Sequence, residues 1–151
     1  MNADLIIETF GTGMIGVTTS HGETTVTASR DILVPLLRFL KEREEFAFDF
    51  LTDLCGVDHL PETPRFRIVY HLYSFKHRHR LRIKIAVEES DPVVDSCISI
   101  WAGADWHERE CFDLFGILFR GHPNLQRILL PPEFEGHPLR KDFPLEGLNK
   151  S

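Results

Sequence analysis

The sequence predicts an α+β fold, a two-layer sandwich of helices on an antiparallel or mixed β-sheet, followed by an extended C-terminal arm. Two observations support this prediction. Apolar residues recur at helical spacing in some segments and with a two-residue period in others. After Gly116 the chain becomes both apolar and rich in proline, which suits neither a helix nor an inner strand. We therefore expect an α+β domain over residues 1–116 and a partner-docking arm over 117–151.

The N-terminal elements follow from local pattern and turn chemistry. Residues 3–10 predict a short helix that ends at Gly11. Two β-branched segments, 14–19 and 24–28, predict strands joined by a hairpin turn. The next helix is expected from Ser29 or Asp31 to about Arg43, because its apolar residues fall at helical spacing: Ile32, Leu33, Leu36, Leu37 and Leu40.

Three further strands are predicted from alternation of apolar and polar residues. The first contains Phe46, Phe48 and Phe50, and the second runs from Phe66 to Leu72. The third runs from Leu81 to Val87 and places three basic residues on the face opposite its apolar one: Arg80, Arg82 and Lys84. A basic loop, 74–79, joins the last two strands, and residues 92–100 are expected to be irregular.

The next segment, 105–115, predicts a helix with polar residues on both faces. Asp105 is the expected N-cap with Glu108 completing a capping box, and Gly116 is the expected left-handed C-cap. On a helical wheel, Glu108 and His107 fall within the apolar arc. Trp106 falls outside it, among the polar residues Asp105, Arg109, Glu110 and Asp113. This pattern is typical of a helix held between its own domain and another surface.

The arm carries the sequence Gly-His-Pro twice, at 121–123 and 136–138, and we interpret both as turns. Its apolar side chains need a surface to cover them. We expect the arm to extend away from its own core and to lie on a partner.

Composition limits the other function classes. The chain of 151 residues has a net charge of −6 and three cysteines without a C-x-x-C pair, which argues against a disulfide framework, a zinc site or a cysteine-bound iron–sulfur cluster. Nucleotide-binding glycine motifs are absent. No apolar run approaches the roughly 20 residues that cross a bilayer, so any membrane association is expected to be indirect. The N-terminal residues do not resemble a signal peptide.

Charge is unevenly distributed along the chain. Residues 65–84 carry basic side chains and no acid, whereas 88–113 are strongly acidic. This asymmetry fits docking between charged surfaces, or a solvated sheet edge. A nucleic-acid-binding module that uses the 65–84 hairpin, with Tyr70 and Tyr73 as stacking groups, is a remote alternative, because the overall acidity argues against it.

The sequence predicts neither a catalytic nor a metal site in this chain. His107, Glu110 and Asp113 share helical spacing, but no second helix supplies further ligands. Glu108 and Glu110 lie on opposite sides of the predicted helix and cannot act as one acid–base pair.

A forty-residue pattern of fixed spacing resembles the signature of the C subunit, the 30 kDa-type peripheral-arm subunit of NADH:quinone oxidoreductase (respiratory complex I). A weaker similarity covers residues 50–58. The signature residues are Trp106, Glu108, Arg109, Glu110, Asp113, Gly116, Phe119, Gly121, His122, Pro123, Arg127, Gly136, Pro138, Leu139, Arg140, Lys141, Asp142 and Pro144.

This resemblance implies a non-redox structural subunit that supports electron transfer from NADH to quinone coupled to proton pumping. The chain itself would carry no cofactor, while FMN and iron–sulfur clusters would belong to other subunits. Its partners would be the quinone-site subunit, which is related to hydrogenase large subunits, and other peripheral-arm subunits at the cytoplasmic face of a bacterial or archaeal membrane. The alternative is the equivalent subunit of an energy-converting hydrogenase, formate hydrogenlyase or ferredoxin-dependent relative. We expect the acidic helix residues to hold the arm and partners, with Arg140 and Lys141 as basic counterparts and Arg127 pairing across the partner contact.

Overall fold

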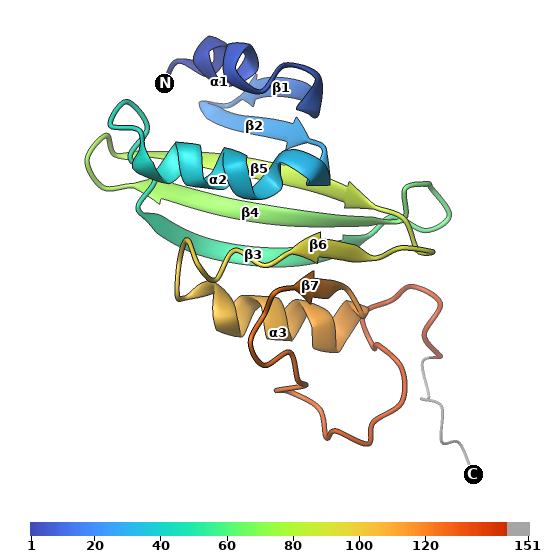
Figure 1. Cartoon of the computed structure of the whole chain (residues 1–151). Coiled ribbons are helices and arrows are strands. Elements are labelled where there is room, and N and C mark those ends of the chain that lie inside the picture. Colours follow the sequence, from blue (N-terminus) through green and yellow to red (C-terminus); the bar gives the residue numbers. More distant parts are fainter. Residues whose placement is uncertain (145–151) are drawn as a thin grey trace.

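A five-stranded mixed sheet with helices packed on one face forms the body of the computed structural model, which describes residues 1–144 (Figure 1). The strand order is β1-β2-β5-β4-β3, and only the β2–β5 pair is parallel. The predicted α+β class is therefore confirmed. The last seven residues of the predicted arm, 145–151, lie outside the described residues.

The N-terminal elements match the sequence prediction closely. Helix α1 (Ala3–Phe10) is followed by a short 3-10 turn, and β1 (Met14–Ser20) pairs with β2 (Glu23–Ala28) as a hairpin. Helix α2 (Leu33–Glu42) begins after a 3-10 turn over Arg30–Ile32, in which the Ser29 side chain caps the Asp31 N–H. The leucines of α2 face the sheet and are fully buried: Leu33, Leu36, Leu37 and Leu40.

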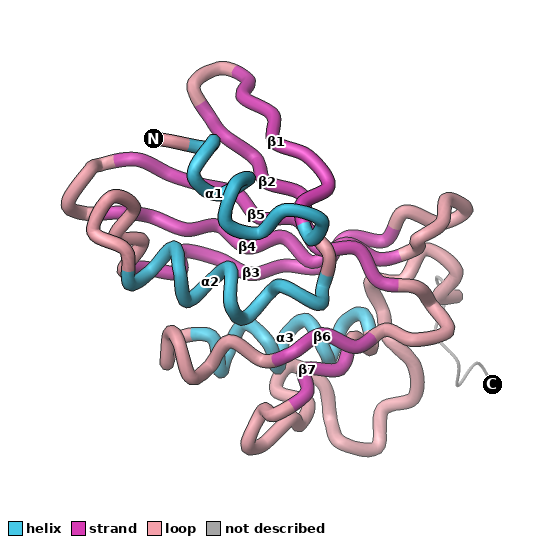
Figure 2. The backbone as a smooth tube through the Cα atoms, turned by 45° about the horizontal axis from the view of Figure 1, so that its top comes forward, coloured by secondary structure: helices cyan, strands magenta, loops and turns pink. Residues whose placement is uncertain are grey.

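The three central strands present one apolar face and one polar face. Strands β3 (Phe50–Asp58), β4 (Phe66–Ser74) and β5 (His79–Val87) are antiparallel neighbours, with Ile68 opposite Ile85 and Tyr70 opposite Ile83. These side chains are buried under the helices. Arg80 on the opposite face is exposed, as the alternation predicted. The two faces of the sheet therefore have different environments, and the polar one is not covered by a helix of this chain (Figures 1 and 2).

The predicted strand over Phe46, Phe48 and Phe50 is wrong in its first part. Residues 44–49 form turns and irregular backbone, and the strand begins only at Phe50. Ala47 adopts a φ of 46°, which breaks the extended conformation between two fully buried phenylalanines. Phe46 and Phe48 thus reach the core from a bend, while Phe50 lies exposed on the sheet.

A second, two-stranded sheet was not predicted. Within the segment expected to be irregular, β6 (Val93–Asp95) pairs in parallel with β7 (Leu118–Arg120). Strand β6 contacts α2 and β7 contacts helix α3 (Ala104–Phe115), so the pair lies between the two helices (Figure 2). Because Ile117 and Phe119 are buried in the core, the compact domain continues past the boundary expected at Gly116.

Helix α3 packs along β3, the edge strand of the large sheet. At Gly56 the helix and strand approach so closely that a Cβ atom would lie 2.7 Å from Cδ2 of Phe115. Among residues 1–144, no helix is long and apolar enough to cross a membrane.

Candidate functional site

Helix α3 is held to the body of the domain through a buried carboxylate. Glu108 has no exposed surface, and its carboxylate accepts hydrogen bonds from Ser96 Oγ at 2.5 Å and from the Cys97 N–H at 2.8 Å. Burial raises the pKa of Glu108 above its ordinary value. The predicted capping box is wrong, because Gly103 occupies the cap position without a side-chain bond and Glu108 reaches a different segment. Glu108 therefore fixes the helix laterally.

Asp113 is the second buried carboxylate of α3, and the arm binds it. Its Oδ2 accepts three consecutive backbone N–H groups, from Ile128, Leu129 and Leu130, at 2.8–3.1 Å. Its Oδ1 accepts Nη1 of Arg127 at 2.7 Å. Burial would raise the pKa of Asp113, but the Leu129 N–H and Arg127 outweigh burial and hold it below the usual range. The wheel placed Asp113 on the outer, polar face, which is wrong because the arm covers that face.

Further arm contacts satisfy the carbonyl groups at the end of α3. His137 Nδ1 lies 3.0 Å from the Asp113 carbonyl oxygen, and Arg140 Nε donates to the Phe115 carbonyl at 2.7 Å. Arg127 Nη2 also donates to the Gly136 carbonyl within the arm. The two Gly-His-Pro segments form turns as predicted, with a φ of 88° at Gly121 and 89° at Gly136. The arm is thus a ring of hydrogen bonds around the C-terminus of α3.

Gly116 is confirmed as the left-handed C-cap, with a φ of 77°. A Cβ atom there would lie 2.7 Å from Cδ2 of His137 and 2.8 Å from Nη2 of Arg140, so the arm leaves no room for a side chain.

We expect Gly116→Ala to lower the free energy of unfolding by at least about 1–2 kcal/mol, because it combines left-handed strain with displacement of the arm. Gly103→Ala is the matched control at the other end of the same helix, where a Cβ meets nothing within 4 Å and φ is −63°. Urea denaturation of both variants checks the difference. Equal stability of the two would contradict this role of Gly116.

A buried ion-pair cluster ties the end of the described arm to β3. The side chain of Arg65 is 3% exposed and that of Asp58 is 2% exposed. Arg65 Nη2 lies 2.8 Å from Asp58 Oδ2 and 2.8 Å from Asp142 Oδ1, and its Nη1 lies 2.9 Å from Glu89 Oε1. Asp58 also accepts the backbone N–H of Lys141 at 2.7 Å. Sequence reasoning missed Arg65, whose only signal was the similarity of the neighbouring segment 50–58.

Several basic residues therefore have partners other than those predicted. Arg127 pairs with Asp113 of its own chain, not with a partner subunit, and Arg140 and Lys141 donate to backbone carbonyl groups of Phe115 and Leu60. The described arm does not extend away from its own core but returns over α3 (Figure 1). These contacts are possible because Asp113 and Asp58 present buried carboxylates at the place where the arm passes.

Other signature residues occupy distinct positions around this junction. Phe119 is buried in β7, and Arg109 Nε donates to the Gln126 carbonyl of the arm at 3.2 Å. His122 Nε2 lies 2.8 Å from Asp105 Oδ1, although the angle is too poor for a hydrogen bond. Three apolar side chains remain exposed on α3 and the arm: Trp106 at 55%, Leu129 at 52% and Leu139 at 52%. The outward position of Trp106 agrees with the helical wheel.

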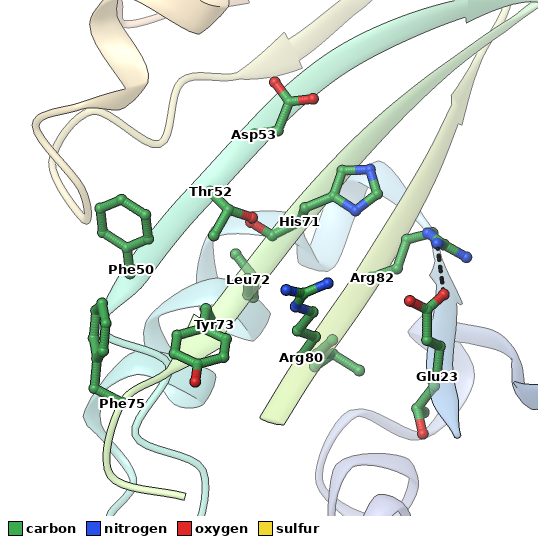
Figure 3. A pocket seen from close by; sticks show the side chains of 12 residues that line it. Glu23, Phe50, Thr52, Asp53, His71, Leu72, Tyr73, Phe75, Arg80 and Arg82 are labelled. Carbon is green, nitrogen blue, oxygen red and sulfur yellow. Dashed lines mark hydrogen bonds and ion pairs between the residues drawn. The ribbon is translucent and has the colours of Figure 1, made fainter. Parts of the chain in front are cut away.

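A groove of about 610 Å³ crosses the polar face of the sheet (Figure 3). Phe75 packs edge-on against Tyr73, with ring centroids 5.0 Å apart, and Arg80 and Arg82 line the same groove. The nucleic-acid alternative loses part of its basis here. Tyr70 is fully buried and cannot stack on a base, and Arg65 is neutralised by three carboxylates.

The model of the family "Respiratory-chain NADH dehydrogenase, 30 Kd subunit" matches residues 26–149, which include the whole α3–arm junction. The chain belongs to this family.

Relatives and solved structures agree with this assignment. The NADH-quinone oxidoreductase C subunit of Roseiflexus castenholzii (strain DSM 13941 / HLO8) is 49% identical over 132 residues, which are 87% of this chain and 76% of the relative. The second of the numbered NADH-quinone oxidoreductase C subunits of Rhizobium meliloti (strain 1021) is 49% identical over 142 residues, 94% of this chain and 78% of the relative. A trypsin-resistant fragment of Nqo5 superposes with a TM-score of 0.71 at 30% identity, covering 83% of this chain and all of that one.

A structure of the membrane-bound sulfane sulfur reductase, an archaeal respiratory membrane complex, superposes with a TM-score of 0.78 over 95% of this chain and 84% of that one. Its sequence identity is 24%, so it shows a shared fold alone. In the 30 kDa family, then, the signature residues of this chain serve mainly to fasten the arm to α3.

Proposed function

We propose that this chain is the C subunit of a proton-translocating NADH:quinone oxidoreductase and acts as a structural component of its peripheral arm. One observation carries the proposal. Within residues 1–144, the charged signature groups Glu108, Asp113 and Arg127 are engaged by the chain's own backbone and side chains. Groups used in this way hold a shape and are not free for acid–base chemistry on a substrate. The fixed shape presents a surface to neighbouring subunits.

The residues that support docking are apolar. Trp106 on α3 and Leu129 and Leu139 on the arm are each about half exposed or more. Fully burying a large apolar side chain contributes roughly 1.5–3 kcal/mol, so a subunit interface is the natural place for them. Tryptophan is also enriched among the residues that dominate binding energy at interfaces. In this proposal the contacting partner is the quinone-site subunit, and the chain reaches the cytoplasmic face of the membrane only through the complex.

The electron carriers in this proposal belong to other subunits. Three cysteines cannot supply the four thiolates that iron–sulfur clusters of the ferredoxin type require. The energy-converting hydrogenases and formate hydrogenlyase remain the alternative assembly. The subunits that co-purify with the tagged chain distinguish the two.

We expect Trp106→Ala to reduce recovery of the assembled complex, because an interface tryptophan typically contributes about 2 kcal/mol or more. The isolated variant should keep its melting temperature, since the indole is exposed in the free chain. Ile15→Ala is the matched control, because Ile15 is 67% exposed on β1 at the opposite edge of the sheet. Affinity purification with quantification of co-purifying subunits measures the effect. Normal assembly of Trp106→Ala would contradict docking through α3.

A further inference from the structure

Three potential metal-binding side chains converge on the polar face of the sheet, apart from the α3–arm junction. Asp53 and Cys55 belong to the edge strand β3, and His71 is the cross-strand partner of Asp53 on β4. Their carboxylate, thiol and imidazole atoms all lie within 4.8 Å of one another. Figure 3 shows Asp53 and His71 projecting from adjacent strands at one end of the groove. Among residues 1–144, this is the only such group.

A fourth side chain approaches from a different element. Nδ1 of His107, on α3, lies 3.5 Å from Oδ1 of Asp53. In a tetrahedral zinc site with bonds of about 2.0–2.3 Å, ligand atoms are about 3.3–3.8 Å apart. The Asp53–His107 separation already falls in this range. The other three atoms need to move together by about 1 Å, which small side-chain rotations can supply because the site is at the surface.

The local charges suit a cation that binds with loss of the thiol proton. Asp53 and Glu110 both add negative potential at Cys55, while Arg82 opposes them. The guanidinium of Arg82 is already engaged, with Nη2 3.1 Å from Glu23 Oε2 and Nη1 3.3 Å from Thr25 Oγ1. A dication bound to one carboxylate and one thiolate would be neutral overall. The Oδ1 atom of Asp53 also accepts the Leu54 N–H at 2.9 Å, which orients the carboxylate.

We propose that Asp53, Cys55 and His71, with His107 as the fourth ligand, bind a zinc-class divalent cation. Sulfur together with imidazole nitrogen selects zinc over magnesium or calcium, which prefer oxygen. The site would join β3, β4 and α3 and would thereby brace the helix that carries the arm. It departs from the expectation drawn from cysteine spacing, because cross-strand partners such as Asp53 and His71 are far apart in sequence.

The test uses the full chain, treated with a chelator and then freed of it. Zn²⁺ is titrated in competition with a chromophoric chelator, and Co²⁺ is titrated while the absorption of a thiolate–cobalt bond is followed. We expect binding of one ion per chain in the micromolar range or tighter. Cys55→Ser should abolish the thiolate–cobalt absorption, and His71→Gln should weaken Zn²⁺ binding by about tenfold or more.

His21→Gln is the matched control, because His21 lies exposed in the β1–β2 turn. It should bind Zn²⁺ as the unaltered chain does. His107→Gln tests the fourth ligand separately and should also weaken binding, whereas unchanged affinity would remove His107 from the site. Circular dichroism confirms that each variant is folded. Absence of one-to-one binding, or unchanged binding in folded Cys55→Ser and His71→Gln, would overturn the proposal, and the four side chains would then be ordinary polar residues of a solvated sheet.

Discussion

Replacement of Arg65 by methionine is expected to lower the free energy of unfolding by about 3–5 kcal/mol, because it leaves a buried carboxylate without its charge partner. Asp58 has only 2% of its side chain exposed and cannot turn to solvent in place. The loss of charge also releases Asp142 and Glu89, but both are more than half exposed and can be hydrated. Urea denaturation at neutral pH measures the change.

Two further variants separate this pair from a general charge effect. Arg80→Met removes an exposed arginine of the polar sheet face and should change stability by less than about 0.5 kcal/mol. Asp58→Asn combined with Arg65→Met removes both charges and should recover part of the loss. If Arg65→Met alone were as stable as Arg80→Met, the cluster would not contribute to stability.

The pH dependence has a defined sign. Hydrogen bonds from Arg65 hold the pKa of Asp58 well below its usual range, against burial, with help from the Lys141 N–H. A lowered folded-state pKa contributes stability that is fully present above the unfolded value of about 3.9 and is lost as the pH falls below it. Without Arg65 the folded-state pKa rises, so the acid-induced loss of stability should begin at a higher pH in Arg65→Met.

Elements defined by local pattern were predictable from the sequence. The leucines of α2 and the alternating residues of β4 and β5 bury the faces that their spacing indicates, because hydrophobic periodicity is a property of one segment. The bend at Ala47 has no such signal. Phe46 and Phe48 alternate as a strand would, yet both enter the core from a turn.

Pairings between distant segments could not be predicted in this way. Strands β6 and β7 are three residues each, too short for a periodic signal, and they form because α3 brings them side by side. The same limit explains the error at Asp113. A helical wheel shows which residues share a face, but it cannot show that residues 127–130 return to cover that face. The resemblance identified the important residues, and the structure supplies their partners.

Replacement of Asp113 by alanine is expected to release the arm while leaving the core folded. The substitution removes the acceptor of three backbone N–H groups and of Arg127, whose side chain is only 11% exposed. Breaking a buried charged pair from one side typically costs about 3–5 kcal/mol. A loss of about 3 kcal/mol at this contact corresponds to a roughly hundredfold increase in the fraction of opened arm. Hydrogen exchange of residues 124–144 should accelerate accordingly.

Glu110→Ala is the matched control, because it deletes a carboxylate from the same helix and, within the described part of the chain, Glu110 has no hydrogen bond to the arm. Amides in β4 and β5 should exchange equally slowly in both variants, since α3 contacts β3 and not these strands. A double-mutant cycle with Arg127→Met isolates the ion pair from the backbone contacts, because the coupling between the two changes measures the pair alone. If Asp113→Ala and Glu110→Ala showed the same exchange in the arm, the carboxylate would not anchor it. If exchange instead accelerated throughout the sheet, Asp113 would support the whole domain and not the arm in particular.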